Sequence, residues 1–89
     1  MGEVEVVVQV LPDSVEADLK EIRSKIEDTL SSKLTIKSIV DVPYAFGLNT
    51  LKATLLMDDA EGGPDLVEEL LSKIEGVGTI RFEEINRLL

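Results

Sequence analysis

Residues 40–57 read VDVPYAFGLNTLKATLLM, and they decide how the rest of the chain is arranged. The segment begins as an alternating strand, and Pro43 interrupts that strand because proline has no N–H for a ladder hydrogen bond. Phe46-Gly47 marks a turn, since glycine readily adopts the backbone angles that tight turns need. Beyond the turn, the alternation returns as the most apolar strand of the chain. We therefore expect two strands joined by a loop, at residues 34–42 and 50–57.

The alternation in these two strands also predicts which side chains are buried. For the strand at 50–57, the inner row is Leu51, Ala53, Leu55 and Met57. For the strand at 34–42, the inner row is Leu34, Ile36, Val40 and Val42, with Ser38 as its odd member. The outer row of that strand is then Thr35, Lys37, Ile39 and Asp41.

The segment before this stretch predicts a strand followed by a helix. Residues 3–11, EVEVVVQVL, alternate so that one face carries Val4, Val6, Val8 and Val10. After Pro12, Asp13 and Glu16 have the spacing of a capping box, and Ser14 is an alternative cap. The helix then runs to Leu30 with an apolar stripe made of Val15, Leu19, Ile22, Ile26 and Leu30.

The segment after it predicts a second helix and a fourth strand. Pro64 suits the first turn of a helix, and Gly76 suits its end. The strand runs from Val77 to about Glu83, which leaves residues 84–89 as a terminal turn or extended arm.

The order β-α-β-β-α-β contains two interleaved crossovers, which place both helices on one face of a four-stranded antiparallel sheet. We therefore expect an α+β fold, a ferredoxin-like two-layer sandwich, formed by residues 1–89 as a single domain. The opposite face of the sheet should be bare, because the chain supplies only two helices.

Composition excludes several classes of function. Eighteen acidic against nine basic residues give a net charge of −9, which argues against direct nucleic-acid binding. The chain has no Cys and no His, so thiol chemistry, a Ser-His-Asp triad and the commonest zinc ligands are absent. We expect no metal and no cofactor. The acidic start and the lack of a long apolar run predict a cytoplasmic protein without a membrane segment.

Two glycine-containing segments could be mistaken for ligand sites. Residues 58–63, DDAEGG, lack the ligand spacing of a calcium loop, so a solvated turn is the better interpretation. The loop YAFGL at residues 44–48 is different, because two of the three aromatic residues of the chain fall there. Such a loop is either a contact anchor or a cap over the end of the core, and residue type slightly favours the cap.

The chain resembles the guanine nucleotide exchange domains of translation elongation factor 1-beta, especially the compact archaeal form. The most specific matching motif is VPYAFGL at residues 42–48, followed by Leu51-Lys52. Further matches, in the same order along the chain, are VQVLPDS at 8–14, DDAEGG at 58–63, IEGV at 74–77 and INRLL at 85–89. The family has the same ferredoxin-like fold that the pattern predicts.

The resemblance implies that the protein exchanges GDP for GTP on translation elongation factor 1-alpha without making or breaking a bond. Phe46 matches the loop phenylalanine that contacts the partner, and Tyr44, Gly47 and Leu48 surround it. The family's C-terminal residues reach toward the magnesium and phosphate loop of the GTPase. The implied partner-binding residues are Tyr44, Phe46, Gly47, Leu48, Arg87, Leu88 and Leu89.

The C-terminus departs from one feature of the family. Eukaryotic members end in a lysine followed by one apolar residue, whereas here the penultimate residue is Leu88 and the nearest cation is Arg87. Either Arg87 substitutes after a shift of one residue, or the metal is dislodged mainly by sterics and loop movement. The arginine guanidinium is planar and donates through several N–H groups, whereas the lysine ammonium is a compact charge, so the two are not interchangeable.

Two further classes of function stay open alongside the exchange factor. The runner-up is an amino-acid-sensing regulatory domain of the same topology, which would need neither the 44–48 loop nor the C-terminal residues. An enzyme comes third, because the usual acid–base and nucleophilic residues are missing. We expect the exchange factor to act as a monomer.

Overall fold

The computed structural model describes residues 2–45, 47–58 and 62–87 of the chain. Within them the elements follow in the predicted order β-α-β-β-α-β, which is confirmed. Their bounds are β1 (Glu3–Pro12), α1 (Leu19–Leu30), β2 (Thr35–Pro43), β3 (Asn49–Asp58), α2 (Gly63–Ser72) and β4 (Val77–Arg87). None of the helices in this part of the chain is long and apolar enough to span a membrane.

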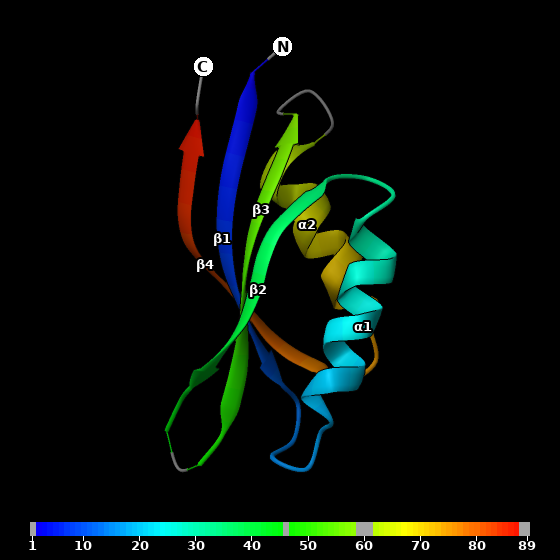
Figure 1. Cartoon of the computed structure of the whole chain (residues 1–89), viewed down its shortest axis with the longest axis vertical. Coiled ribbons are helices and arrows are strands. Elements are labelled where there is room, and N and C mark those ends of the chain that lie inside the picture. Colours follow the sequence, from blue (N-terminus) through cyan, green and yellow to red (C-terminus); the bar gives the residue numbers. More distant parts are fainter. Residues whose placement is uncertain (1, 46, 59–61, 88–89) are drawn as a thin grey trace.

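The four strands form one antiparallel sheet in the order β2-β3-β1-β4. Both helices lie on the same face of this sheet, so the molecule has two layers (Figure 1). Strands β1 and β3 are central, and β2 and β4 are the edges. This strand order and the single helical layer confirm the predicted ferredoxin-like sandwich.

The hydrophobic core fills the space between the sheet and the helices. The alternate valines of β1 and the predicted inner row of β3 are buried there, because both central strands turn one face toward the helices. From the helices come Ile22, Ile26, Leu30, Val67, Leu71 and Ile74. The sequence pattern therefore predicted the core of the two central strands correctly.

The start of α1 lies five residues beyond the predicted capping box, so that prediction is wrong. Asp18 is the N-cap, and its carboxylate accepts hydrogen bonds from the backbone N–H groups of Lys20 and Glu21 at 3.0 and 3.4 Å. The backbone N–H of Asp13 instead donates to the carbonyl of Gly76 at 2.9 Å. Val15, assigned to the buried stripe, is 74% exposed. Asp13 therefore follows the end of β1 and bonds to the residue before β4, instead of capping the helix.

The inner and outer rows of β2 are exchanged halfway along the strand. A bulge lies between Ile36, which pairs with Leu55, and Ser38. One extra residue reverses the alternation, so Ile39 packs against the core while Val40 is 47% exposed. Ile36 is placed as predicted, but the inward assignment of Val40 and of Val42 is wrong.

The C-terminal residues extend the sheet beyond the predicted end of the last strand. Residues 84–87 belong to β4, and they pair with β1 from Val7 to Val4. A second bulge shifts the register between Val7 and Val8. Phe82 and Ile80 lie opposite the inner valines of β1, so they pack against the core as the alternation predicts. Arg87 therefore has a fixed place at the end of an edge strand.

The sheet face opposite the helices is bridged by side chains instead of by another layer. The Lys37 ammonium lies 2.8 Å from the Glu5 carboxylate, and Lys52 lies 3.1 Å from Glu83. Both pairs join strands that are not neighbours in the sheet. Val7 on this face is only 7% exposed. The prediction of a face without helices is confirmed, but its middle is not bare.

Candidate functional site

The loop between β2 and β3 is closed by its own backbone. The N–H of Tyr44 donates to the carbonyl of Leu48 at 2.7 Å, and the N–H of Leu48 donates to the carbonyl of Ala45 at 3.1 Å. Gly47 has a φ of 76°, and a Cβ placed there would meet no atom within 4 Å. Glycine is therefore favoured at this position because its φ is positive, and not because a larger side chain would clash with neighbouring atoms. Phe46 lies outside the described residues.

Tyr44 joins this loop to the far edge of the sheet. Its side chain is partly exposed, and its hydroxyl accepts a hydrogen bond from Nη1 of Arg81 at 3.3 Å. Because the sheet order is β2-β3-β1-β4, this contact connects the β2–β3 loop to β4 across both central strands. Leu48, on the other side of the turn, is half-buried. The loop therefore has a defined shape at its base.

A buried polar pair lies where the loop joins the sheet. The amide Nε2 of Gln9 donates to Oγ1 of Thr50 at 2.9 Å, and that hydroxyl donates to the carbonyl of Val42 at 2.9 Å. Gln9 is 7% exposed, and Thr50 is fully buried. Sequence reasoning missed Gln9, Thr50 and the role of Arg81. The one feature of the sequence that could have indicated this pair is Gln9, the single amide side chain in the valine-rich run at residues 3–11.

Of the C-terminal candidates, the structure describes Arg87, which lies at the other end of the molecule. Arg87 ends β4 and pairs with Val4, near the start of the chain. Leu88 and Leu89 lie outside the described residues. Figure 1 shows the C-terminus and the β2–β3 loop at opposite ends of the longest axis, along which the Cα atoms extend 41 Å. The described candidates Tyr44, Gly47 and Leu48 are therefore not brought together with Arg87.

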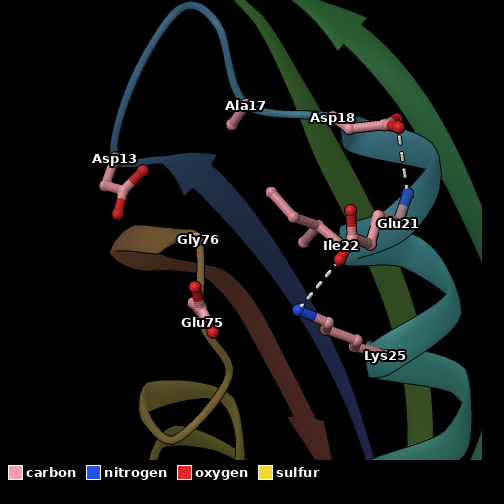
Figure 2. A pocket seen from close by; sticks show the side chains of 8 residues that line it. All are labelled: Asp13, Ala17, Asp18, Glu21, Ile22, Lys25, Glu75 and Gly76. Atoms are coloured by element: carbon pink, nitrogen blue, oxygen red, sulfur yellow. Dashed lines mark hydrogen bonds and ion pairs between the residues drawn. The ribbon is translucent and has the colours of Figure 1, made fainter.

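A hollow of about 220 Å³ lies beside the start of α1, between the β1–α1 and α2–β4 connections (Figure 2). Half of its lining residues are acidic, and two of these have a structural role. Asp18 caps α1, and Glu21 forms an ion pair with Lys25 at 3.3 Å. The Asp13–Gly76 backbone hydrogen bond closes one side. This geometry stabilises the start of the helix and gives no catalytic arrangement.

The part of the chain that the structure describes contains no group of three or more acidic side chains placed to bind a metal ion. In the DDAEGG segment, Asp58 ends β3 and Gly62 precedes α2, while residues 59–61 are outside the described ranges. The described residues also hold no arrangement for acid–base chemistry between buried groups. Among the described residues, the β2–β3 loop and the end of β4 therefore stay the candidate sites, as two separate places on the surface (Figure 1).

Comparison with known proteins gives a family match over nearly the whole chain. A family model described as the EF-1 guanine nucleotide exchange domain matches residues 5–88. Elongation factor 1-beta of Methanosarcina acetivorans is 37% identical over 89 residues, covering 99% of this chain and 100% of the relative. The proteins of the same name from Methanothermobacter thermautotrophicus and Aeropyrum pernix are 36% and 40% identical over 89 residues. These alignments cover 100% and 99% of this chain, and 100% and 99% of the relatives.

A solved structure shares the fold at lower sequence similarity. It is the solution structure of the C-terminal domain of the MgtC protein from Mycobacterium tuberculosis. The two chains superpose with a TM-score of 0.59 at 25% identity, over 98% of this chain and 87% of the other. Because one sandwich architecture serves many unrelated functions, this likeness says less about activity than the family match does.

Proposed function

The chain belongs to the family of EF-1 guanine nucleotide exchange domains, and we propose that it promotes exchange of GDP for GTP on translation elongation factor 1-alpha. The observation that carries this proposal is the family match over residues 5–88. The match favours exchange over the alternative of a small-molecule-sensing domain. The protein acts as a monomer in the cytoplasm, with no cofactor and no covalent step.

Such a factor works by binding one state of its partner more tightly than the other. It binds the nucleotide-free GTPase more tightly than the GDP-bound form. By linkage, the exchange factor and GDP therefore weaken each other's binding to the GTPase by the same factor. GDP then dissociates faster, and incoming GTP displaces the factor. The protein needs no general base and no nucleophile for this work, which agrees with a sequence that contains neither Cys nor His.

We assign different tasks to the two ends of the domain. The loop at Tyr44–Leu48 is the binding anchor, because its backbone is closed by hydrogen bonds and it presents a partly exposed tyrosine. Residues 87–89 act on the nucleotide site, as the family resemblance implies. The 41 Å extent of the domain supports two contacts that are far apart on the partner.

Two routes are open for the C-terminal residues, and variants of Arg87 separate them. If the guanidinium supplies the charge that the family's lysine supplies, Arg87→Ala lowers the maximal exchange rate and Arg87→Lys restores much of it. If sterics displace the nucleotide, both variants keep the rate, while shortening the chain by two residues lowers it.

The function is tested by release of a fluorescent GDP analogue from elongation factor 1-alpha, chased with excess unlabelled GDP. Catalytic amounts of the protein should accelerate release, and the rate should saturate with the concentration of the factor. A heat-denatured sample is the control for nonspecific effects. No acceleration at micromolar concentrations would defeat the assignment.

A further inference from the structure

We infer that Gln9, Thr50 and Arg81 are positioning residues for the loop at Tyr44–Leu48: they fix its orientation on the sheet before the partner arrives. This inference rests on the proposed function, in which the loop is the anchor. The side chains act through the loop, since two of them are buried and the third contacts Tyr44.

The buried pair is the first observation. Gln9 and Thr50 are the buried polar side chains of the described residues, and they are hydrogen-bonded to each other. They are separated by 41 positions in the sequence, on the adjacent strands β1 and β3. A hydroxyl has one proton, so Thr50 donates it to Val42 and accepts from Gln9 with a lone pair. The chain of bonds therefore has one direction and runs through three strands.

The position of the pair is the second observation. Thr50 pairs with Val42 in the sheet register, and the next pair is Pro43 with Asn49, where the loop begins. Pro43 has no N–H to donate, so backbone hydrogen bonding weakens at the last pair before the loop. The Thr50 hydroxyl supplies a side-chain bond immediately below that point. A polar pair at this place stabilises the root of the hairpin, where an apolar pair would add only packing.

The third observation is the Arg81–Tyr44 contact. Arg81 lies opposite Gln9 in the register of β1 and β4, on the face without helices. The acid Glu83 on the same strand is engaged by Lys52. Arg81 donates to the Tyr44 hydroxyl, so the loop is held from the far edge of the sheet as well as from its root.

Together these contacts hold the loop from β1, β3 and β4. A loop that is already oriented loses less conformational freedom on binding, so pre-organisation raises affinity. It does not alter the step in which nucleotide leaves, because that step is assigned to the other end of the domain. Loss of the contacts should therefore change the half-saturating concentration and leave the maximal exchange rate unchanged.

The test compares Thr50→Val with Thr54→Val. Both variants replace a threonine by its isostere on the same face of β3, but Thr54 lies opposite Val7 and Ser38, farther from the loop. Two quantities are measured in each: the exchange kinetics, and the hydrogen-exchange rate of the Tyr44 amide, which is bonded to Leu48. Thr50→Val should raise both the half-saturating concentration and the amide exchange rate about threefold to tenfold. Thr54→Val should change neither.

Conservative and surface variants keep the test decisive if Thr50→Val folds poorly. Thr50→Ser retains the hydroxyl and should restore both readouts to near the parent values. Arg81→Met changes an exposed side chain and should raise the half-saturating concentration about twofold to fivefold, with no change in the melting temperature beyond about 2 °C. Added to Tyr44→Phe, it should have no further effect, since both remove the same contact.

The outcomes separate this inference from the proposed function. If the Tyr44 amide exchanges equally fast in the two valine variants, these residues do not position the loop, and the inference is wrong. If the amide responds but the half-saturating concentration does not, the loop is held but is not the anchor, which also overturns the inference. If the parent protein does not accelerate GDP release from elongation factor 1-alpha, the proposed function fails, and the amide measurement alone still decides whether the loop is positioned.

Discussion

Deleting Arg87–Leu89 should leave binding of elongation factor 1-alpha nearly intact and reduce its nucleotide exchange. The deletion removes the residues assigned to the nucleotide site and leaves the loop at Tyr44–Leu48 untouched at the other end of the domain (Figure 1). If that division of tasks is correct, affinity and exchange rate respond separately.

The structure limits how much stability this deletion can cost. Strand β4 pairs with β1 at nine positions, of which the deletion removes the terminal one, Val4 with Arg87. One terminal pair holds one or two hydrogen bonds, so the loss is about 1–2 kcal/mol of unfolding free energy. For a chain of 89 residues this lowers the melting temperature by about 5–10 °C. A domain with ~5 kcal/mol or more of stability stays folded at 25 °C.

The loss of exchange should be larger than this change in stability. If Arg87 acts through its charge, removing one charge-assisted contact of about 1.5–3 kcal/mol from the exchange complex slows GDP release by about ten- to a hundredfold. Stopped-flow release of a fluorescent GDP analogue gives the maximal rate. Titration of the GDP-bound GTPase gives the affinity that the loop should retain, because a contact that drives exchange is made in the nucleotide-free state. Unchanged exchange, or affinity lost together with exchange, would refute the division of tasks.

Other substitutions test the loop and the corrected parts of the fold. Phe46→Ala should raise the half-saturating concentration in the GDP-release assay with a melting temperature within about 3 °C of the parent, because the anchor meets a partner; a collapse of the melting temperature would make Phe46 a core residue. Gly78→Ala should destabilise by about 1–3 kcal/mol in urea titrations, because its Cβ would lie 2.8 Å from the Cα of Asp13. Asp18→Ala should cost about 1 kcal/mol as the loss of a helix cap, whereas Asp13→Ala keeps its backbone bond to Gly76 and should cost less; equal losses would count against the cap assignment.

The pattern predicted the central strands better than the edges, for a physical reason. β1 and β3 pair without a register shift, so simple alternation assigns Val4 and Leu55 to the core. The pairing of edge strand β2 with β3 has one register shift, and that of edge strand β4 with β1 has two. One extra residue reverses every later assignment. No residue type in TIKSIVDVP marks the bulge after Ile36, because its position follows from pairing with β3.

The candidate site could be predicted only where chemistry is local. A glycine beside aromatic residues marks a loop, and Gly47 indeed has a positive φ. The partners of the loop are not local: Arg81 is 37 positions from Tyr44, and Gln9 is 41 from Thr50. A strand sequence cannot reveal such contacts before the order of the strands is known. The family resemblance directed attention to the loop, and its role there stays a prediction. The resemblance gave no information on what holds the loop.

Under the proposed function, the separation of the loop from the end of β4 would let a small domain couple binding to nucleotide release. A contact that is equally strong in both states of the GTPase raises affinity but shifts no equilibrium, so only a contact that differs between the states drives exchange. The loop makes a contact that is equally strong in both states if it is anchored away from the nucleotide. The end of β4 makes the contact that differs between the states if it reaches the nucleotide site. The two central strands, bonded along their whole length, keep these ends at a fixed distance, so binding energy gained at the loop holds the C-terminal residues in place.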